Sequence, residues 1–332
     1  MIHGDKRRTA LERWLGTQWQ GARFALAPAS EDASFRRYFR ATLDDGRSFV
    51  AMDAPPDKED CRPFIHVAQL LTAAGVHAPE VHAQDLQQGF LLLSDLGTRT
   101  YLQELTAQNA PRLFGEATDA LILWQRATRA GELPPYDAAL LRRELNLFPE
   151  WYLGKHLSLA LSDEKKIALE KIFETLVASA LAQPAVYVHR DFMPRNLMLS
   201  EPNPGVLDFQ DAVLGPITYD VGSLFRDAFL SWEEEQVLDW TVRYWEKAKK
   251  AGLPVQADFG EFWRAFEWMG LQRHLKVLGI FARINYRDGK PKYLEDTPRF
   301  IAYAKATARR YAELGGLLRL LDELEMKTAR AG

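Results

Sequence analysis

The sequence predicts an α+β protein of two lobes, in which a small antiparallel sheet precedes a larger, mainly helical part. The first hundred residues contain short apolar, strand-like runs separated by turn-forming residues. Beyond residue 98, apolar residues recur at the spacing of amphipathic helices in one long segment after another. A chain of 332 residues also exceeds the length at which a single hydrophobic core usually keeps growing. We therefore expect one lobe over residues 1–97 and a second over residues 98–332.

The first lobe is expected to contain a small sheet with two accompanying helices. Alternating apolar residues predict strands over residues 23–27, 36–43 and 48–52, and helical spacing predicts helices over 9–20 and 60–74. The apolar run from Phe90 to Leu93 predicts a buried strand near the end of this lobe. The second lobe is expected to consist largely of amphipathic helices over residues 111–128, 163–181, 233–251, 259–283, 297–313 and 315–328.

The composition excludes several classes of protein. Lys and Arg (42) nearly balance Asp and Glu (45), which gives a net charge of −3 and indicates no nucleic-acid partner. The single cysteine, Cys61, excludes an intrachain disulfide and a cysteine-rich metal site. No apolar run approaches membrane-spanning length, and the N-terminal residues are polar and basic without an apolar signal-like run. We therefore expect a cytoplasmic protein with no membrane partner. We also expect a monomer, although nothing in the sequence determines the oligomeric state.

One short stretch contains the residues that best predict the chemistry of this protein. Residues 188–199 read VHRDFMPRNLML, which matches the pattern H-R-D-x-x-x-x-N between two apolar runs. This is the catalytic-loop pattern of kinase-like phosphotransferases. A phosphoryl acceptor needs a carboxylate within hydrogen-bond reach of its hydroxyl, and Asp191 is the candidate. The phosphates being transferred need Mg²⁺, to which Asn196 offers a carbonyl oxygen.

A second carboxylate follows in the next strand-like run. The residues Gly205-Val206-Leu207 lead directly into Asp208, which would hold the metal together with Asn196. A lone buried histidine is usually a packed core residue, so we assign His189 a structural role. Each part of the motif alone is weak. The ordered set of two carboxylates and one amide, each next to an apolar run, is specific.

On these residues the chain is similar to the aminoglycoside phosphotransferase/choline kinase superfamily. The resemblance is carried by the catalytic-loop motif, by the sequence DFQDA at residues 208–212 and by Gly215-Pro216 and Tyr219-Asp220, and it covers about residues 25–300. It implies a two-lobed, protein-kinase-like fold that uses ATP and Mg²⁺. It also implies that Asp220 braces the catalytic loop, and that backbone groups of Leu93, Ser94 and Asp95 bind the adenine.

Two sequence segments resemble those of a bacterial subgroup within this superfamily. These are RELNLFPEW at residues 143–151 and LDFQDA at residues 207–212. The subgroup consists of cytoplasmic amino-sugar kinases of cell-wall recycling, which phosphorylate N-acetylmuramate and N-acetylglucosamine at the anomeric oxygen. The resemblance implies an amino sugar and ATP as the small-molecule partners.

The nucleotide-binding part departs from the protein-kinase pattern. The loop between the first two predicted strands has no glycine-rich motif. Either Ser30 and Ser34 with neighbouring backbone N–H groups bind phosphate there, or the loop is an ordinary solvated turn.

A lysine is also missing from the third strand, where the sequence is Val50-Ala51-Met52-Asp53. An arginine could replace it, because the guanidinium fork suits phosphate. Alternation along the second strand puts Arg36 and Arg40 on one face and Arg37 on the other. The sequence does not choose among them, and Lys58 is the nearest lysine.

The acceptor is less determined than the phosphoryl donor. A protein kinase needs a long activation segment and an A-P-E anchor, and both are absent. An aminoglycoside or other small-molecule hydroxyl phosphotransferase is the main alternative, although a polycation site should be rich in carboxylates. A pseudokinase or scaffold is disfavoured by the intact motif. The residues expected to contact the sugar are Glu144, Asn146, Trp151 or Tyr152, Arg195 and Asp211, with Arg226, Arg273 or Arg283 for the lactyl carboxylate of N-acetylmuramate.

Overall fold

The computed structural model describes residues 5–31 and 35–331, and for residues 30, 31 and 326–331 it describes the backbone alone. The chain divides into two compact units, of which one comprises Met1–Thr106 with Arg195–Asp211 and the other Ala107–Pro194 with Ala212–Gly332. The predicted fold class is confirmed, since an antiparallel five-stranded sheet lies in the first unit and the second is mainly helical. The segment Arg195–Asp211 belongs to the first unit, although the preceding loop residues belong to the second.

The first unit is built on a sheet with the strand order β1-β2-β3-β5-β4, and every neighbouring pair is antiparallel. Its strands are β1 (Phe24–Glu31), β2 (Arg37–Leu43), β3 (Ser48–Asp53), β4 (Val81–Asp85) and β5 (Phe90–Ser94). Its helices are α1 (Lys6–Gln18), α2 (Arg62–Ala73) and the short α3 (Tyr101–Glu104), and a two-residue pair, β7 (Leu197–Met198) with β8 (Gly205–Val206), completes it. The sequence did not predict β4, whose side chains alternate between exposed and half-buried without a fully buried position.

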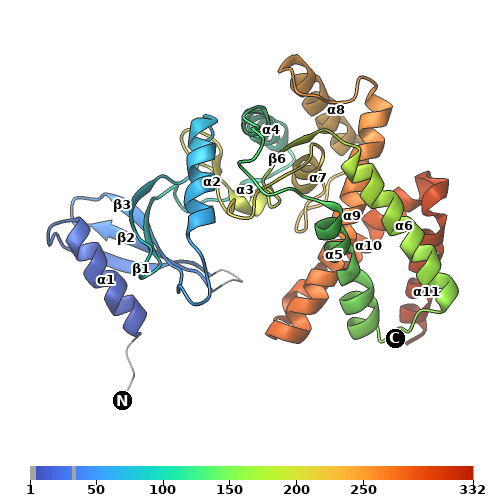
Figure 1. Cartoon of the computed structure of the whole chain (residues 1–332), viewed down its shortest axis with the longest axis horizontal. Helices are drawn as coiled ribbons and strands as arrows, with labels where there is room; N and C mark the ends of the chain where they lie inside the picture. Colours follow the sequence, from blue (N-terminus) through green and yellow to red (C-terminus); the bar gives the residue numbers. More distant parts are fainter. Residues whose placement is uncertain (1–4, 32–34, 332) are drawn as a thin grey trace. The chain divides into compact units, whose positions relative to one another are not determined.

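Alternation along the strands separates two faces of this sheet. One cross-strand row contains Arg40, Val50 and Leu93, because Arg40 pairs with Val50 and Val50 with Leu93. The neighbouring row faces α1, which lies across the strands in Figure 1. This face forms a core of the buried residues Leu11, Leu15, Phe39, Ala41, Ala51, Phe90 and Leu92. The sheet is therefore anchored on the α1 side, which leaves the row of Arg40 for the opposite face.

The second unit is built around α9 (Phe259–Asp288), a helix of 30 residues. The elements that surround it are α4 (Ala110–Arg126), α5 (Ala138–Leu147), α6 (Asp163–Leu181), α7 (Tyr219–Phe225), α8 (Glu234–Lys250), α10 (Thr297–Arg310) and α11 (Gly315–Ala331). The strands β6 (Ala185–Val188) and β9 (Val213–Pro216) pair antiparallel, so the predicted catalytic loop follows directly from β6. No helix in the described part of the chain has the length and apolar character needed to cross a bilayer.

A close helix contact explains why a glycine lies in the middle of α9. A Cβ atom on Gly279 would come within 2.3 Å of the backbone carbon of Leu147, at the end of α5. Only glycine allows this approach. The chain then continues as a π-helix over Phe148–His156, which the sequence did not predict. π-Helical turns are rare and occur frequently near functional sites.

Candidate active site

A buried carboxylate supports the backbone of the predicted catalytic loop. Asp220, fully buried in the first turn of α7, accepts hydrogen bonds from the backbone N–H groups of His189 (2.7 Å) and Arg190 (3.0 Å). Burial raises the pKa of Asp220 to about 7, although the two N–H donors favour its ionised form. These two hydrogen bonds fix the backbone immediately before Asp191, and the bracing role expected for Asp220 stays a prediction.

Arg190 has a backbone conformation that non-glycine residues rarely adopt. Its φ angle is 76°, in the left-handed region, which costs about 1–2 kcal/mol. Its guanidinium donates a 2.6 Å hydrogen bond to the carboxylate of Glu144, a residue of α5 that is 5% exposed. Lys276 of α9 reaches the same carboxylate at 2.9 Å and the hydroxyl of Tyr219 at 3.0 Å. The hydroxyl of Tyr136 also donates to Glu144. The side chain of Arg190 is thus fixed by a buried ionic cluster.

The opposite charges in this cluster stabilise one another. Burial opposes the ionisation of Glu144, but Lys276 and Arg190 outweigh it and hold the pKa of this carboxyl below its ordinary value. Burial likewise opposes the charge of Lys276, but the nearby Tyr219, Glu144 and Asp191 raise the pKa of the lysine. Glu144 was expected to contact the sugar. In the structure its carboxylate is bound by four side chains of the protein, those of Tyr136, Arg190, Lys276 and Gln272. Contact with the sugar therefore stays a prediction for Glu144.

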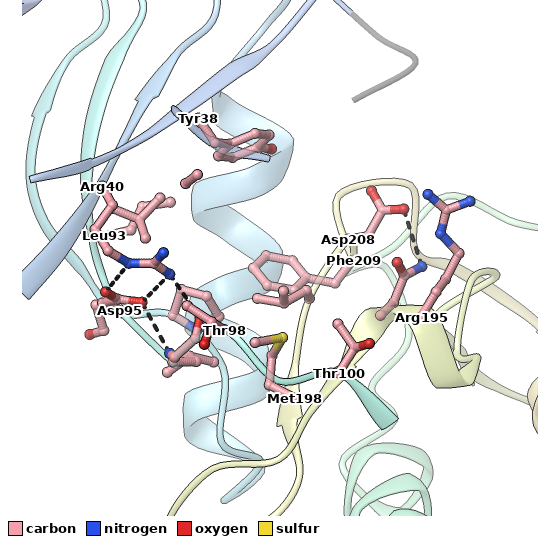
Figure 2. Close-up of a pocket in the computed structure, with 18 of the residues that line it drawn as sticks. Tyr38, Arg40, Leu93, Asp95, Thr98, Thr100, Arg195, Met198, Asp208 and Phe209 are labelled. Carbon is pink, nitrogen blue, oxygen red and sulfur yellow. Dashed lines mark hydrogen bonds and ion pairs between the residues drawn. The ribbon is translucent and has the colours of Figure 1, made fainter. Parts of the chain in front are cut away.

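A pocket of about 300 Å³ lies in the first unit (Figure 2), on the face of the sheet that carries Arg40, Val50 and Leu93. Its apolar lining comes from the sheet, from α2 and from the segment around β7 and β8, and includes Val50, Phe64, Leu93, Met198, Leu207 and Phe209. The three residues predicted to contact the adenine, Leu93, Ser94 and Asp95, all line it. An apolar pocket at the end of a strand suits a flat base.

An ion pair stiffens one wall of this pocket. Asp95 accepts hydrogen bonds from Arg40 at 2.6 and 3.0 Å and from the hydroxyl of Ser48 at 2.5 Å. Burial alone would raise the pKa of Asp95. The hydrogen bonds from Arg40 and Ser48 outweigh burial and hold the pKa of this carboxyl below its ordinary value. Arg40 was predicted to contact the nucleotide. It lines the pocket, and it also binds Asp95 and the carbonyl oxygen of Gly97.

The two predicted metal ligands lie together at another part of this pocket (Figure 2). The amide nitrogen of Asn196 donates to one carboxylate oxygen of Asp208 at 3.3 Å, and the amide nitrogen of Gln210 donates to the other at 2.9 Å. Asp208 has a left-handed backbone, with φ of 65°, that directs it out of the strand-like run. An amide and a carboxylate side by side offer hard oxygen donors that fit Mg²⁺, with the remaining ligands left to phosphate and water.

The arginines of the second strand separate as alternation predicted. Arg37 binds the buried Asp53 at 2.5 Å and also Asp5, on the α1 side of the sheet. Arg36 instead places its guanidinium 3.9 Å from the carboxylate of Asp208, with its side chain only 11% exposed. Of the three arginines, Arg36 is therefore the one beside the predicted metal ligand.

The other residues predicted for the site lie in varied surroundings. Asn146, Arg195 and Asp211 are exposed, and Arg195 lines the pocket of the first unit. Trp151 lies in the π-helix, half-buried against the core of the second unit. Ser34 and the side chain of Ser30 lie outside the described residues. The sequence reasoning missed Lys276 and Tyr136; the only signal for Lys276 is a lysine within the apolar stretch Leu275–Leu278.

Known proteins resemble this chain over most of its length. An N-acetylmuramate/N-acetylglucosamine kinase of Pseudomonas aeruginosa is 60% identical over 301 residues, which cover 90% of this chain and 89% of that protein. A protein of the same name from Pseudomonas putida is 57% identical and covers 91% of this chain and 88% of its own. A solved choline kinase of Streptococcus pneumoniae shares the fold with a TM-score of 0.64 at 10% identity, over 90% of this chain and 99% of its own.

A model of the phosphotransferase enzyme family matches residues 25–259. This match and the two bacterial relatives confirm the resemblance that the loop motif indicated, and with it a phosphotransferase activity. The chain therefore belongs to the phosphotransferase enzyme family.

Proposed function

We propose that this protein is an ATP-dependent kinase that transfers the γ-phosphate to the anomeric hydroxyl of N-acetylmuramate and N-acetylglucosamine. The observation that carries the proposal is the likeness to two kinases named for these sugars, at 57% and 60% identity over about nine tenths of the chain. The product would be a sugar 1-phosphate for cell-wall precursor recycling. Such a role places the enzyme in the cytoplasm.

Asp191 supplies the acceptor side of the reaction. Its carboxylate accepts a hydrogen bond from the acceptor hydroxyl, orients that oxygen toward the γ-phosphate and takes its proton as the new bond forms. The brace by Asp220 and the ion pair of Arg190 support this role, since they fix the residues on the N-terminal side of Asp191. Most of the rate enhancement then comes from positioning.

Asn196, Asp208 and Arg36 supply the donor side. Asn196 and Asp208 would hold Mg²⁺, which neutralises negative charge on the phosphates when it is bound. Arg36, 3.9 Å from Asp208, takes the place of the missing lysine of the third strand and binds phosphate oxygens through its fork. The pocket lined by Leu93, Ser94 and Asp95 accepts the adenine.

The anomeric hydroxyl suits a site with a single carboxylate base. A hemiacetal hydroxyl is more acidic than an ordinary alcohol, because the ring oxygen withdraws electrons. One carboxylate can therefore accept the proton of this hydroxyl with little further assistance. In-line geometry at Asp191 then selects one anomer, because only one presents its oxygen to the γ-phosphate.

The proposal is tested by incubating the enzyme with Mg-ATP and single sugars and recording the ³¹P NMR spectrum of the product. The panel contains both N-acetylated amino sugars, glucosamine, glucose and an aminoglycoside. The expected result is a sugar 1-phosphate resonance, with phosphorus coupled to the anomeric proton, for the two N-acetylated sugars. Phosphorylation of the aminoglycoside alone would instead support the antibiotic-kinase alternative.

A further inference from the structure

Arg273 is a buried cation that forms no ion pair with the residues that the structure describes. It lies on α9 and is 3% exposed. Its enclosed Nη1 has no hydrogen-bond acceptor among those residues. Other buried cations of the same unit are paired, since Lys276 lies 2.9 Å from Glu144 and Arg226 lies 3.1 Å from Glu267. A buried guanidinium that contacts no carboxylate of the described chain is costly, so it marks a candidate site for an anion.

The two carboxylates that face Arg273 are occupied elsewhere. Both oxygens of Asp220 accept hydrogen bonds from the catalytic loop. One oxygen of Asp227 accepts from the backbone N–H groups of Phe229 (2.7 Å) and Leu230 (3.1 Å), and the other has no partner in the described part of the chain. Burial raises the pKa of both carboxyl groups, and the charge of Arg273 opposes this without forming a contact. An unfilled donor and an unfilled acceptor therefore lie in one region.

This region is next to the catalytic loop. Asp220 bonds the backbone of Arg190, the residue before Asp191, and Arg273 is close enough to Asp220 to influence its ionisation. The helices α7 and α9 approach closely here, since a Cβ on Gly222 would lie 3.7 Å from Gly270, one turn before Arg273. A ligand with its hydroxyl at Asp191 could thus extend an anionic group toward Arg273.

We infer that Arg273 binds the lactyl carboxylate that distinguishes N-acetylmuramate from N-acetylglucosamine. The inference rests on the proposed function and names the residue that sets the preference between its two sugars. A guanidinium fork matches a carboxylate in two parallel hydrogen bonds. The free oxygen of Asp227 accepts an O–H or N–H of the same sugar.

The other two arginines considered from the sequence are placed differently. Arg226 is bound to Glu267 and its guanidinium lies over the rings of Trp263 (5.6 Å) and Phe266 (5.1 Å). Arg283 is half-buried near the C-terminal end of α9, where burial and Arg287 lower the pKa of its guanidinium. Arg273 thus combines burial, the lack of an ion pair within the described part of the chain, and proximity to Asp220, which bonds the loop.

The test compares kcat/KM for N-acetylmuramate, its methyl ester and N-acetylglucosamine in wild type, Arg273→Met and Arg273→Lys. Wild type should prefer the free acid to the ester. In Arg273→Met this acid-to-ester ratio should fall about 10- to 100-fold, the range for a hydrogen-bonded charge pair. Arg273→Lys keeps the charge without the fork and should retain part of the preference. Arg226→Met, which removes a paired buried arginine, should leave the ratio as in wild type.

Three outcomes would overturn the inference. The first is an equal loss on all three sugars in Arg273→Met, which would make Arg273 a structural counter-charge for Asp220 and Asp227. The second is an unchanged acid-to-ester ratio. The third is a wild-type enzyme that does not distinguish acid from ester, which decides the matter even if the methionine variant does not fold. Failure of the proposed function would look different, since wild type would then phosphorylate none of the three sugars.

Discussion

The guanidinium of Arg190 and the carboxylate of Glu144 form a 2.6 Å hydrogen bond that ties the catalytic loop to α5. The left-handed backbone of Arg190 costs about 1–2 kcal/mol. This conformation persists because Glu144 binds the side chain and Asp220 binds the backbone N–H. Two carboxylates from separate helices therefore determine how the chain enters Asp191. The loop depends on this cluster, although neither carboxylate belongs to the H-R-D-x-x-x-x-N motif.

Glu144→Gln should lower both stability and turnover. Glutamine keeps the size of the side chain but leaves the half-buried Arg190 and the buried Lys276 without this counterion. Breaking a buried pair in this way costs about 3–5 kcal/mol in the free energy of unfolding, which urea denaturation measures. We also expect kcat to fall at least about 10-fold with little change in the KM for ATP, because the loop loses its fixed geometry.

Glu170→Gln is the matched control, since Glu170 pairs with Arg142 on a side chain that is 55% exposed. This substitution should change the free energy of unfolding by less than about 1 kcal/mol. Equal effects of the two substitutions would mean that Glu144 acts as an ordinary surface partner and does not support the loop.

Asp191→Asn should preserve nucleotide binding and remove most turnover. The variant keeps the shape of the side chain but cannot take the acceptor proton, so kcat should fall by about two to four orders of magnitude. Binding of a fluorescent ATP analogue checks that the pocket is intact. A variant with more than a tenth of the wild-type kcat would exclude Asp191 as the acceptor base.

Arg36→Ala should weaken the interaction with the phosphates of ATP. Arg36 approaches Asp208 to 3.9 Å, whereas Arg37 is bound to Asp53 on the opposite face of the sheet. We expect kcat/KM for ATP to fall about 10- to 100-fold in Arg36→Ala, the range for a charge-assisted hydrogen bond. Arg37→Ala is the control and should affect thermal stability far more than the KM for ATP. A near-normal kcat/KM for ATP in Arg36→Ala would reject Arg36 and direct attention to Arg40 or Lys58, whereas a loss confined to Arg37→Ala would point to Arg37.

Asp208→Ala should remove detectable activity, and Asn196→Ala should raise the Mg²⁺ concentration needed for half-maximal rate. Both predictions follow from the convergence of these side chains, whose polar atoms lie 3.3 Å apart. A Mg²⁺ titration of the initial rate, with circular dichroism as a check of folding, separates metal loss from unfolding. Wild-type Mg²⁺ dependence in both folded variants would place the metal elsewhere.

Much of the first unit could be predicted because strand alternation is a local property. The period of two predicted that Arg36 and Arg40 lie on the other face from Arg37, and the structure places Arg40 in the pocket and Arg37 against Asp53. The short apolar runs next to Asp191, Asn196 and Asp208 similarly indicated that these three residues are candidates for the site. Local patterns of this kind need no knowledge of distant contacts.

The ionic cluster could not be predicted in the same way. Its members come from separate segments of the chain: Tyr136, Glu144, Arg190, Tyr219 and, on α9 itself, Lys276. They meet because the other segments pack around α9. A buried lysine within a helix looks in sequence like an exposed one. The π-helix was missed for a related reason, because its nine residues, Phe148–His156, follow α5 without a break and their apolar spacing fits an ordinary helix.

The most direct test of the central claim is the stoichiometry of reducing ends and ADP during a single incubation with N-acetylglucosamine and Mg-ATP. Transfer to the anomeric hydroxyl converts the hemiacetal to a glycosyl phosphate, so one reducing end should disappear for each ADP formed. A 1-deoxy analogue should compete with the sugar yet accept no phosphate. Persistence of the reducing-end signal while ADP and sugar phosphate accumulate in equal amounts would show that another hydroxyl is phosphorylated, and it would contradict the proposed reaction.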